Sequence, residues 1–371
     1  MKIGIITWFS SGNYGTNLQA IALQRYLRNL GHSVQIINFE VTAQRNVKRT
    51  FWQKVRSQPQ KYSTKYAKKK YENQISHRYQ KMRDEIQENC ILTERVSDEQ
   101  NYIDICNTFN LLICGSDQIW NPNWYHRFYY ADYDGITTRR ISYAPSLGVN
   151  EIKEEQKKEI ERSLSRFWAV SVREQKGAVL LKPLSHKEPE VVVDPTLLLG
   201  ATEWNEIFPQ KKNCGEKYIL SMFLTDNQLH WKAARRFANA KHLSHVVIPY
   251  CGFSYFQKGE IHADAGVQDF LNLIRGAEYV LTDSFHVTVF SLIYHKQFYT
   301  FERFQEDAFS SQNERVRNIL TIAKSSDRLI PYGMKQIHEK KDIDYNIVGS
   351  VLKTEIEKSK AFLNDAIGDY R

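Results

Sequence analysis

Short apolar stretches rich in β-branched residues recur along the chain and alternate with segments of helical periodicity. The first half contains six of them: KIGIIT, VQIINF, LLICGSD, RISYAPS, WAVSVRE and EVVVDPT. Between the first two, apolar residues repeat at steps of three and four, at Leu18, Ile21, Ala22, Leu23, Leu27 and Leu30. This alternation is typical of parallel strands joined by helical crossovers, so it predicts an α/β fold.

A second series of the same kind follows a stretch rich in Pro and Gly between residues 182 and 202. Its strands are YILSMFL, HVVIPY, YVLTDSF and KQFYTF, and we expect helices near 227–239, 267–276, 285–294 and 312–323. A chain of 371 residues is long enough for two domains. We expect doubly wound domains over 1–182 and 200–345 that face a cleft, with a helix in 346–371 packing across both. Such folds bind ligands at the carboxyl ends of their strands.

Positive charge is concentrated in one segment. The net charge is +9, and residues 42–90 alone contain thirteen Lys and Arg against four Asp and Glu. This segment is also rich in aromatic residues, so we expect a basic helical insertion that contacts an anionic membrane surface. A solvated helical lid is the alternative. Neither half shows a nucleic-acid motif, so we expect no nucleic-acid partner.

The sequence also indicates what the chain lacks. No run of about 18 apolar residues occurs, and the short apolar stretch after Lys2 does not fit a secretory signal. The five cysteines form no CxxC pair and have no His at zinc spacing. We therefore expect a reduced, cytosolic protein, peripheral at the inner face of the cell membrane if the insertion docks there, with no metal site.

The first candidate site follows the first strand, in WFSSGNYGTN. Gly12 and Gly15 allow close approach of a ligand to the backbone, and the next helix begins there. A helix N-terminus carries unpaired N–H groups and partial positive charge, so Asn13 and Gly15 are candidates for binding an anion. The motif is neither GxGxxG nor a Walker loop, and a plain strand–helix turn is the alternative.

Two further candidates end strands in the first half. LLICGSDQIWNP places Ser116 and Asp117 at a carboxyl end, with Trp120 close behind. Asp117 is suited to a site, although a helix cap or Asx-turn is the alternative. WAVSVREQKG ends with Arg173 and Glu174, which point to opposite sides of a strand, so a direct pair between them is unfavourable. Arg173 offers a planar fork of donors that matches a carboxylate or phosphate.

The most informative candidate lies in the second half, in YVLTDSFHVTVF. Asp283 and Ser284 end a strand, and His286 opens the next helix. Imidazole can carry protons in either direction near neutral pH, so His286 is a candidate acid or base. A His that only caps or packs is the alternative.

Six of these segments, in order, resemble the polysaccharide pyruvyl transferase family: residues 13–23, 114–122, 140–148, 171–181, 191–199 and 281–293. The resemblance implies two Rossmann-like domains similar to those of GT-B glycosyltransferases. It also implies transfer of pyruvate from phosphoenolpyruvate to a sugar as a ketal, with no cofactor. The chain departs from the family pattern at Val287, where Gly is common, and has Phe285 before the His.

The resemblance also implies roles for the candidates. Arg173 matches an arginine that holds the donor, His286 matches the acid or base, and Asp117 lines the same cleft as a second catalytic group. Ser284 is an arginine in some members, so another cation must help bind the donor; Arg315 is the first candidate and Lys296 the second. We also expect substrate contacts from a further group: Ser116, Gln19, Trp120 and Asp283.

Two other functions fit parts of the sequence. A GT-B-like glycosyltransferase that uses a nucleotide sugar would need an acidic ribose-binding residue, for which Asp283 and Glu302 are available. A basic protein that only tethers a glycan assembly complex would give His286 no role. Acceptors in polysaccharide assembly are often lipid-linked, which gives the basic insertion a reason to approach a membrane.

Overall fold

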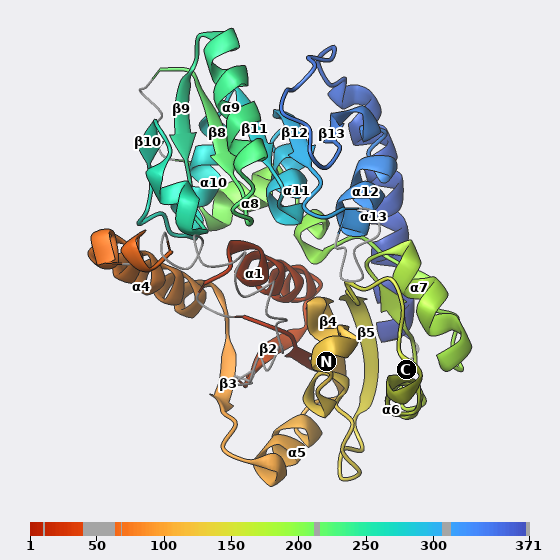
Figure 1. The fold of residues 1–371 in the computed structure, drawn as a ribbon. Coiled ribbons are helices and arrows are strands. Elements are labelled where there is room, and N and C mark those ends of the chain that lie inside the picture. The colour runs from red at the N-terminus through yellow and green to blue at the C-terminus, as the bar shows by residue number, and fades with distance from the viewer. Residues whose placement is uncertain (10–11, 40–63, 68, 211–215, 306–312, 369–371) are drawn as a thin grey trace.

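The computed structural model describes residues 1–9, 12–39, 64–67, 69–210, 216–305 and 313–368, and it contains two parallel sheets flanked by helices (Figure 1). The first sheet has the order β3-β2-β1-β4-β5 and defines the N-terminal half. The second has the order β10-β9-β8-β11-β12-β13 and defines the C-terminal half. In both sheets the strand order reverses beside the first strand of the half, β1 or β8, which is the topological switch point of a doubly wound fold. The predicted fold class is therefore confirmed.

The elements of the N-terminal half are β1 (Lys2–Ile6), α1 (Tyr14–Asn29), β2 (Ser33–Asn38), α4 (Glu72–Asn89), β3 (Leu92–Arg95), α5 (Glu99–Asn107), β4 (Leu111–Asp117), β5 (Arg139–Pro145), α6 (Glu154–Leu164), β6 (Ser171–Val172), α7 (Gln175–Leu181) and β7 (Glu190–Val191). Short 3-10 helices include η1 (Gln118–Trp120), η2 (Pro122–Trp124), η3 (Arg127–Tyr130) and η5 (Pro195–Leu198). Strands β6 and β7 pair with each other beside the main sheet.

The elements that follow are α8 (Ala201–Ile207), β8 (Tyr218–Met222), α9 (Gln228–Lys241), β9 (Ser244–Val247), β10 (Glu260–Ile261), α10 (Val267–Gly276), β11 (Tyr279–Thr282), α11 (Phe285–Ile293), β12 (Gln297–Phe301), α12 (Asn313–Ile322), β13 (Leu329–Ile330) and α13 (Tyr345–Gly368). No helix in these described parts of the chain is both long and apolar enough to cross a bilayer.

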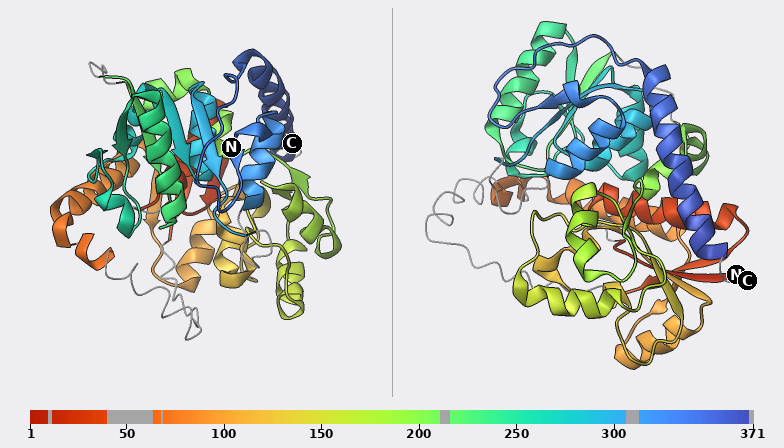
Figure 2. Two further views of the ribbon diagram at one scale, coloured as in Figure 1. Left: turned by 45° about the horizontal axis from the view of Figure 1, so that its top comes forward. Right: turned by 90° about the vertical axis from the view of Figure 1, so that its right-hand side faces the viewer.

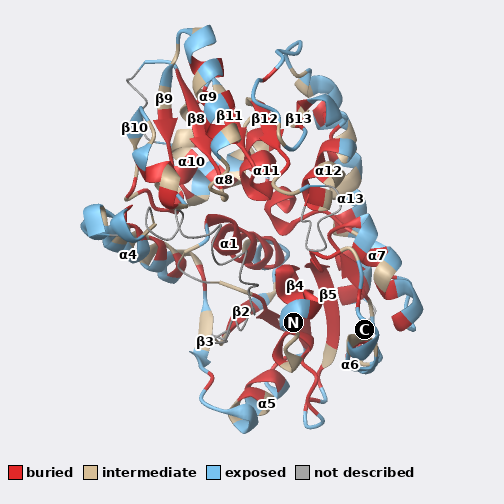
Figure 3. Ribbon diagram, viewed as in Figure 1, coloured by how far each residue is buried: buried red, intermediate tan, exposed pale blue. Residues whose placement is uncertain are grey.

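Helix α1 lies between the two halves and is buried along most of its length (Figure 3). The hydroxyl of Tyr14 donates to the carbonyl of Ala265 at 2.7 Å, and its ring stacks on Phe270 at 4.6 Å between centroids. One apolar cluster runs from Ile3 through α1 to Leu220 in the second sheet. Because this core is continuous, the first turn of α1 is held against the C-terminal half.

The described part of the basic insertion also contacts the C-terminal half. Residues 42–63 and 68 of the predicted 42–90 segment lie outside the described residues. Within α4, the Arg78 guanidinium donates to the carbonyl of Pro249 at 2.8 Å, and the Lys81 ammonium pairs with Asp269 at 2.8 Å. These two cations therefore serve contacts within the molecule.

Helix α13 runs along the side of the molecule past both halves (Figure 2). Near its start, the Tyr345 hydroxyl donates to the carbonyl of Ser291 in α11 at 3.3 Å. In its second half, the Ser359 hydroxyl oxygen accepts from the backbone N–H of Val193 at 2.9 Å. The helix thus fixes the segment just before Asp194.

Candidate functional site

The loop between β1 and α1 is shaped by its own side chains. The Asn13 side-chain oxygen accepts from the N–H groups of Gly15 and Thr16 at 3.0 and 3.3 Å, so it caps the helix. The Gln19 amide donates to the carbonyls of Trp8 and Thr16, at 2.8 Å in each case. Asn13 and Gln19 therefore have structural partners within the loop, and their predicted contacts with a ligand stay predictions.

Asp117 lies at the switch point of the first sheet, where β1 and β4 end side by side. One carboxylate oxygen accepts from the Thr16 hydroxyl at 2.6 Å and the other from the N–H of Gln118 at 2.9 Å. The second oxygen also lies 3.8 Å from a guanidinium nitrogen of Arg173. The backbone at Asp117 has a φ of 60°, which is uncommon for a residue with a side chain. The predicted strand-end carboxylate thus lies at the site.

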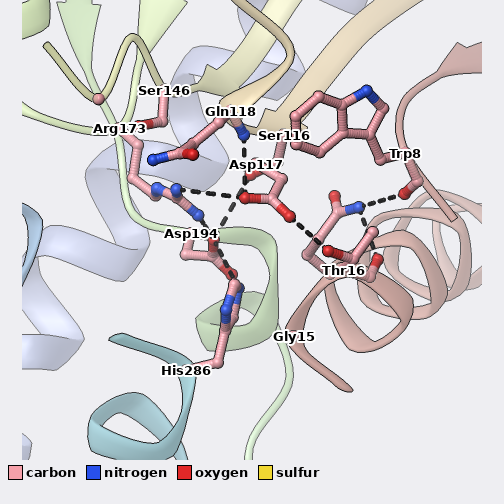
Figure 4. Close-up of polar contacts among 12 residues, drawn as sticks. Trp8, Gly15, Thr16, Ser116, Asp117, Gln118, Ser146, Arg173, Asp194 and His286 are labelled. Atoms are coloured by element: carbon pink, nitrogen blue, oxygen red, sulfur yellow. Dashed lines mark hydrogen bonds and ion pairs between the residues drawn. The ribbon is translucent and has the colours of Figure 1, made fainter. Parts of the chain in front are cut away.

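Arg173 follows β6 and is almost fully buried. Its Nη1 donates to Asp194 at 2.6 Å, and its guanidinium carbon lies 4.6 Å from the centroid of the Phe285 ring (Figure 4). Among the described residues, Nε and Nη2 of Arg173 have no hydrogen-bond partner. Nη2 faces the Asp117 carboxylate in the 3.8 Å ion pair, whereas Nε has neither kind of partner among the described residues. Since a buried donor is normally paired, this part of the guanidinium is a candidate contact for an anionic ligand.

Glu174 turns away from Arg173, as their adjacent positions predict. Its Oε1 accepts from the Ser146 hydroxyl at 2.9 Å and from the N–H groups of Leu147 and Gly148 at 2.8 and 3.3 Å. It therefore orders the loop after β5.

Asp194 is the central residue that the sequence analysis did not single out. Its Oδ1 accepts from the N–H and hydroxyl of Thr196 at 3.0 and 2.7 Å, and its Oδ2 lies 3.6 Å from Nε2 of His286. The same Oδ2 accepts from Arg173. Burial would raise the pKa of Asp194, but His286, Arg173 and Thr196 outweigh it and hold the pKa of this carboxyl well below its usual range.

A sequence signal for Asp194 was present. It directly follows the apolar run VVV and precedes a Pro, much as Asp117 follows the strand LLICGS. A carboxylate that follows an apolar run is a site candidate in both places.

His286 lies in the first turn of α11 and points at Asp194 (Figure 4). Its ring lies so close to Gly15 that a Cβ added there would be 1.9 Å from Nδ1. Gly15 is therefore needed to make room for the imidazole. This contact joins the first turn of α1 in the N-terminal half to the first turn of α11 in the C-terminal half.

Arg315 in α12 completes a buried cationic group. It is 7% exposed, and burial together with repulsion from Arg173 and Arg303 lowers its pKa to about 9. The neighbouring Asn318 donates to the carbonyl of Arg173 at 3.4 Å, so α12 packs directly on the Arg173 segment. Like charges held together in a buried site favour binding of an anion.

Three other candidates lie elsewhere or are engaged by the chain. Trp120 is buried, stacks on Tyr130 at 4.9 Å and donates its indole N–H to a carbonyl, so it packs as a core residue and its expected substrate contact stays a prediction. Lys296 lies three residues beyond the far end of α11, which extends about 10 Å past His286, so it does not reach this site. Asp283 accepts from the N–H of Leu224 at 2.6 Å and from a Thr hydroxyl, which ties β8 to β11.

Two serine candidates lie beside the central group. Ser284 precedes α11 and is 6% exposed, with no side-chain capping bond. The Ser116 hydroxyl donates to the carbonyl of Ala144 at 3.0 Å and lies 3.4 Å from Asp194. Among the described residues, no group of three or more His, Cys, Asp or Glu side chains is placed to hold a metal ion.

The site therefore combines buried guanidinium groups, an imidazole and two carboxylates at the junction of the two halves. The sequence model of the polysaccharide pyruvyl transferase family matches residues 13–303, which include all of these groups except Arg315. The chain belongs to this family. No curated protein is significantly similar to it in sequence.

Solved structures place this pyruvyl transferase family member among GT-B folds. It is similar to the UDP-GlcNAc 2-epimerase of Methanocaldococcus jannaschii, with 12% identity, a TM-score of 0.52, and coverage of 96% of this chain and 93% of that one. It is also similar to the UDP-GlcNAc 2-epimerase of Neisseria meningitidis bound to UDP-GlcNAc, with 8% identity, a TM-score of 0.50, and coverage of 99% and 94%. At these identities the similarity shows the fold alone.

Proposed function

We propose that this transferase moves pyruvate from phosphoenolpyruvate to a sugar of a polysaccharide repeat unit, as a ketal across two hydroxyls. The observation that carries the proposal is the buried cationic group formed by Arg173 and Arg315, in which Nε and Nη2 of Arg173 make no hydrogen bond to the described residues. Phosphoenolpyruvate brings a carboxylate and a phosphate, which match guanidinium groups. His286 lies beside this group and supplies the proton transfers.

The protons of the reaction balance if His286 first gives a proton and later takes one back. His286 protonates the methylene carbon of phosphoenolpyruvate, and the first sugar hydroxyl adds to C2 and returns its proton to the imidazole. The C2–O bond to phosphate then breaks, the second hydroxyl adds to C2, and the released phosphate takes up its proton. Asp194 keeps the imidazole oriented through this sequence, and Asp117 accepts from an incoming hydroxyl. General acid–base help of this kind contributes about 10²–10⁴ in rate.

The alternative donor, a nucleotide sugar, has less support. The residues available to hold a ribose are Asp283 and Glu302. Asp283 accepts from groups of the loop after β8, and Glu302 accepts from Arg317 at 2.7 Å and from the N–H of Tyr332 at 3.2 Å. Both carboxylates are thus occupied by the chain itself.

The membrane contact of the basic insertion also stays a proposal. Arg78 and Lys81 are engaged by the C-terminal half. Docking to an anionic surface therefore depends on the other cations of residues 42–90. A variant in which these other cations are replaced by Glu tests the contact, and the measurement is its co-sedimentation with anionic vesicles. Undiminished co-sedimentation of that variant would refute the contact.

The donor is tested by binding, which needs no acceptor. Phosphoenolpyruvate should raise the melting temperature of the full chain and UDP-glucose should not, because only the former matches the cationic group. Arg173→Met should abolish the shift. A shift with UDP-glucose alone would replace our proposal with the glycosyltransferase.

Turnover is tested separately with labelled phosphoenolpyruvate and an extract of lipid-linked oligosaccharides. Phosphate release should depend on the extract and should be lost in His286→Ala. His295→Ala, at the other end of α11, is the matched control and should stay active. Full activity of His286→Ala would refute its catalytic assignment.

A further inference from the structure

Two tryptophans stand beside the switch point of the first sheet. Trp8 comes two residues after β1, and Trp124 ends η2. Their ring centroids are 6.4 Å apart with 34° between the planes, and Trp8 meets the ring of Tyr129 edge-on at 6.0 Å. The rings therefore form one aromatic surface, which we call the tryptophan pair.

The tryptophan pair keeps contact with solvent, unlike several aromatic residues in the same region. Trp124 is 37% exposed and Trp8 is half-buried. Trp120, Tyr129 and Tyr130 in the same region are at most 4% exposed. The fold thus buries these three rings and leaves the two tryptophan rings accessible.

Both tryptophans are anchored to residues next to Asp117. The Trp124 indole N–H donates to the carbonyl of Gln118 at 3.2 Å. The carbonyl of Trp8 accepts from the Gln19 amide, and the adjacent Thr7 donates its hydroxyl to the carbonyl of Ser116 at 3.3 Å. These bonds hold the pair at a fixed position relative to the site, so little ordering is lost when a ligand binds.

The two sides of Asp117 differ in chemistry. Figure 4 draws Arg173 and Trp8 on opposite sides of the Asp117 carboxylate. The Arg173 side is cationic and suits a small dianion. The tryptophan side offers apolar rings next to a carboxylate, and Asp117 has lone pairs left after its bonds to Thr16 and Gln118.

A neutral hexopyranose has the matching surface. One face of the sugar ring presents C–H groups, which pack on an aromatic ring, and its rim presents hydroxyls, which donate to a carboxylate. We infer that Trp8 and Trp124 form the acceptor-sugar subsite, with Asp117 accepting from a hydroxyl of the bound sugar. This inference rests on the proposed function for the identity of the reaction.

Direct binding tests the subsite without phosphoenolpyruvate. Methyl glycosides of glucose, galactose and mannose are titrated while tryptophan fluorescence is recorded. At least one should change the emission with saturation, and Trp124→Ala should abolish that change. Trp168→Ala is the matched control, because Trp168 is also exposed, at 47%, and packs on Arg139 away from the switch point. It should leave the response intact.

Kinetics give the second readout. Trp8→Ala and Trp124→Ala should raise the KM for the acceptor about tenfold, which is the loss of roughly 1.4 kcal/mol. The KM for phosphoenolpyruvate and its thermal shift should not change, and Trp124→Phe should recover part of the acceptor affinity. If Trp8→Ala fails to fold, the same measurements are made on the single variants Trp8→Phe and Trp124→Ala.

The outcomes distinguish a failure of the acceptor-sugar subsite from a failure of the proposed phosphoenolpyruvate donor. An unchanged acceptor KM in folded Trp124→Ala, or no fluorescence response to any glycoside, would overturn the subsite while phosphoenolpyruvate binding stands. Saturable sugar binding lost in Trp124→Ala, in a chain that does not bind phosphoenolpyruvate, would support the subsite and remove the proposed donor.

Discussion

Individual atoms decide how the site works, and Gly15 is the clearest case. Its missing side chain is what lets His286 lie against α1, since an added Cβ would be 1.9 Å from Nδ1. At Gly12, three residues earlier, an added Cβ would meet only an ordinary contact at 3.5 Å. One glycine is therefore required by a neighbour's ring and the other is not.

Gly15→Ala should displace the His286 ring and lower kcat on the order of 10²-fold, because a shift of about 1 Å at a reacting group can have this effect. The measurement is kcat together with the side-chain NMR signals of His286. Gly12→Ala is the matched control and should retain activity. Equal activity in the two variants would mean that the imidazole does not need this position.

At Arg315 we expect the stability of the ligand-free protein to conflict with the binding of phosphoenolpyruvate. Burial and the neighbouring arginines lower its pKa to about 9, so holding its charge in the free protein is unfavourable. Arg315→Met removes the charge and keeps much of the volume. It should raise the free energy of unfolding by roughly 1–4 kcal/mol, because burial and the neighbouring arginines disfavour the charged form of Arg315 in the fold.

The same Arg315→Met substitution should reduce the thermal shift caused by phosphoenolpyruvate. Urea unfolding with and without this ligand measures both effects. Arg317→Met, whose native guanidinium pairs with Glu302, is the comparison. Loss of stability in Arg315→Met together with unchanged ligand binding would show that the residue is structural.

At the scale of elements, α4 joins the halves through the first turn of α10. The two carboxylate oxygens of Glu85 accept from the N–H groups of Val267 and Gln268 at 2.6 and 2.8 Å. A side chain from the basic insertion therefore caps a helix that begins 182 residues later in the chain. Sequence spacing contains no sign of this contact.

Glu85→Ala should lower the free energy of unfolding by about 1–2 kcal/mol, the usual effect of losing a helix cap. It should also increase hydrogen exchange at the first turn of α10, which denaturation alone would not reveal. Glu88→Ala changes an exposed glutamate on the same helix and should do neither. Unchanged exchange at Val267 would show that α4 does not hold this junction.

At the scale of the molecule, Asp194 connects the halves, since it contacts Arg173 from one and His286 from the other. Its pKa is lowered in the fold, so the folded state gains stability when the carboxyl is ionised. This gain is complete above the unfolded pKa of about 3.9 and fades as the pH falls below it.

Asp194→Asn should therefore lower stability at pH 7 by about 3–5 kcal/mol, because it leaves Arg173 buried without its anion. Its stability should then fall less steeply than that of the wild type between about pH 4 and pH 3. Urea unfolding across this range measures both, with the exposed Asp104→Asn as control. Parallel pH profiles for the two variants would contradict the assignment.

The sequence by itself determined the α/β class, the strands and most helices, because apolar periodicity reports which face of each element is buried. It also singled out Asp117 and Arg173, which end apolar strands, and His286, which opens the helix after one, since the carboxyl ends of parallel strands lie at one edge of a sheet. The C-terminal helix, expected near its observed bounds of Tyr345–Gly368, follows from the same pattern.

Only the tertiary structure decided which of these residues meet. Asp194 is central because it contacts both Arg173 and His286, which are 113 residues apart in the chain. Nothing in the local sequence indicates that these two residues are close in space. Trp120 looked like a site residue and is core, because burial depends on what packs from elsewhere in the fold. Periodicity is a local property, whereas the electrostatics and close approaches of a site depend on contacts that only folding creates.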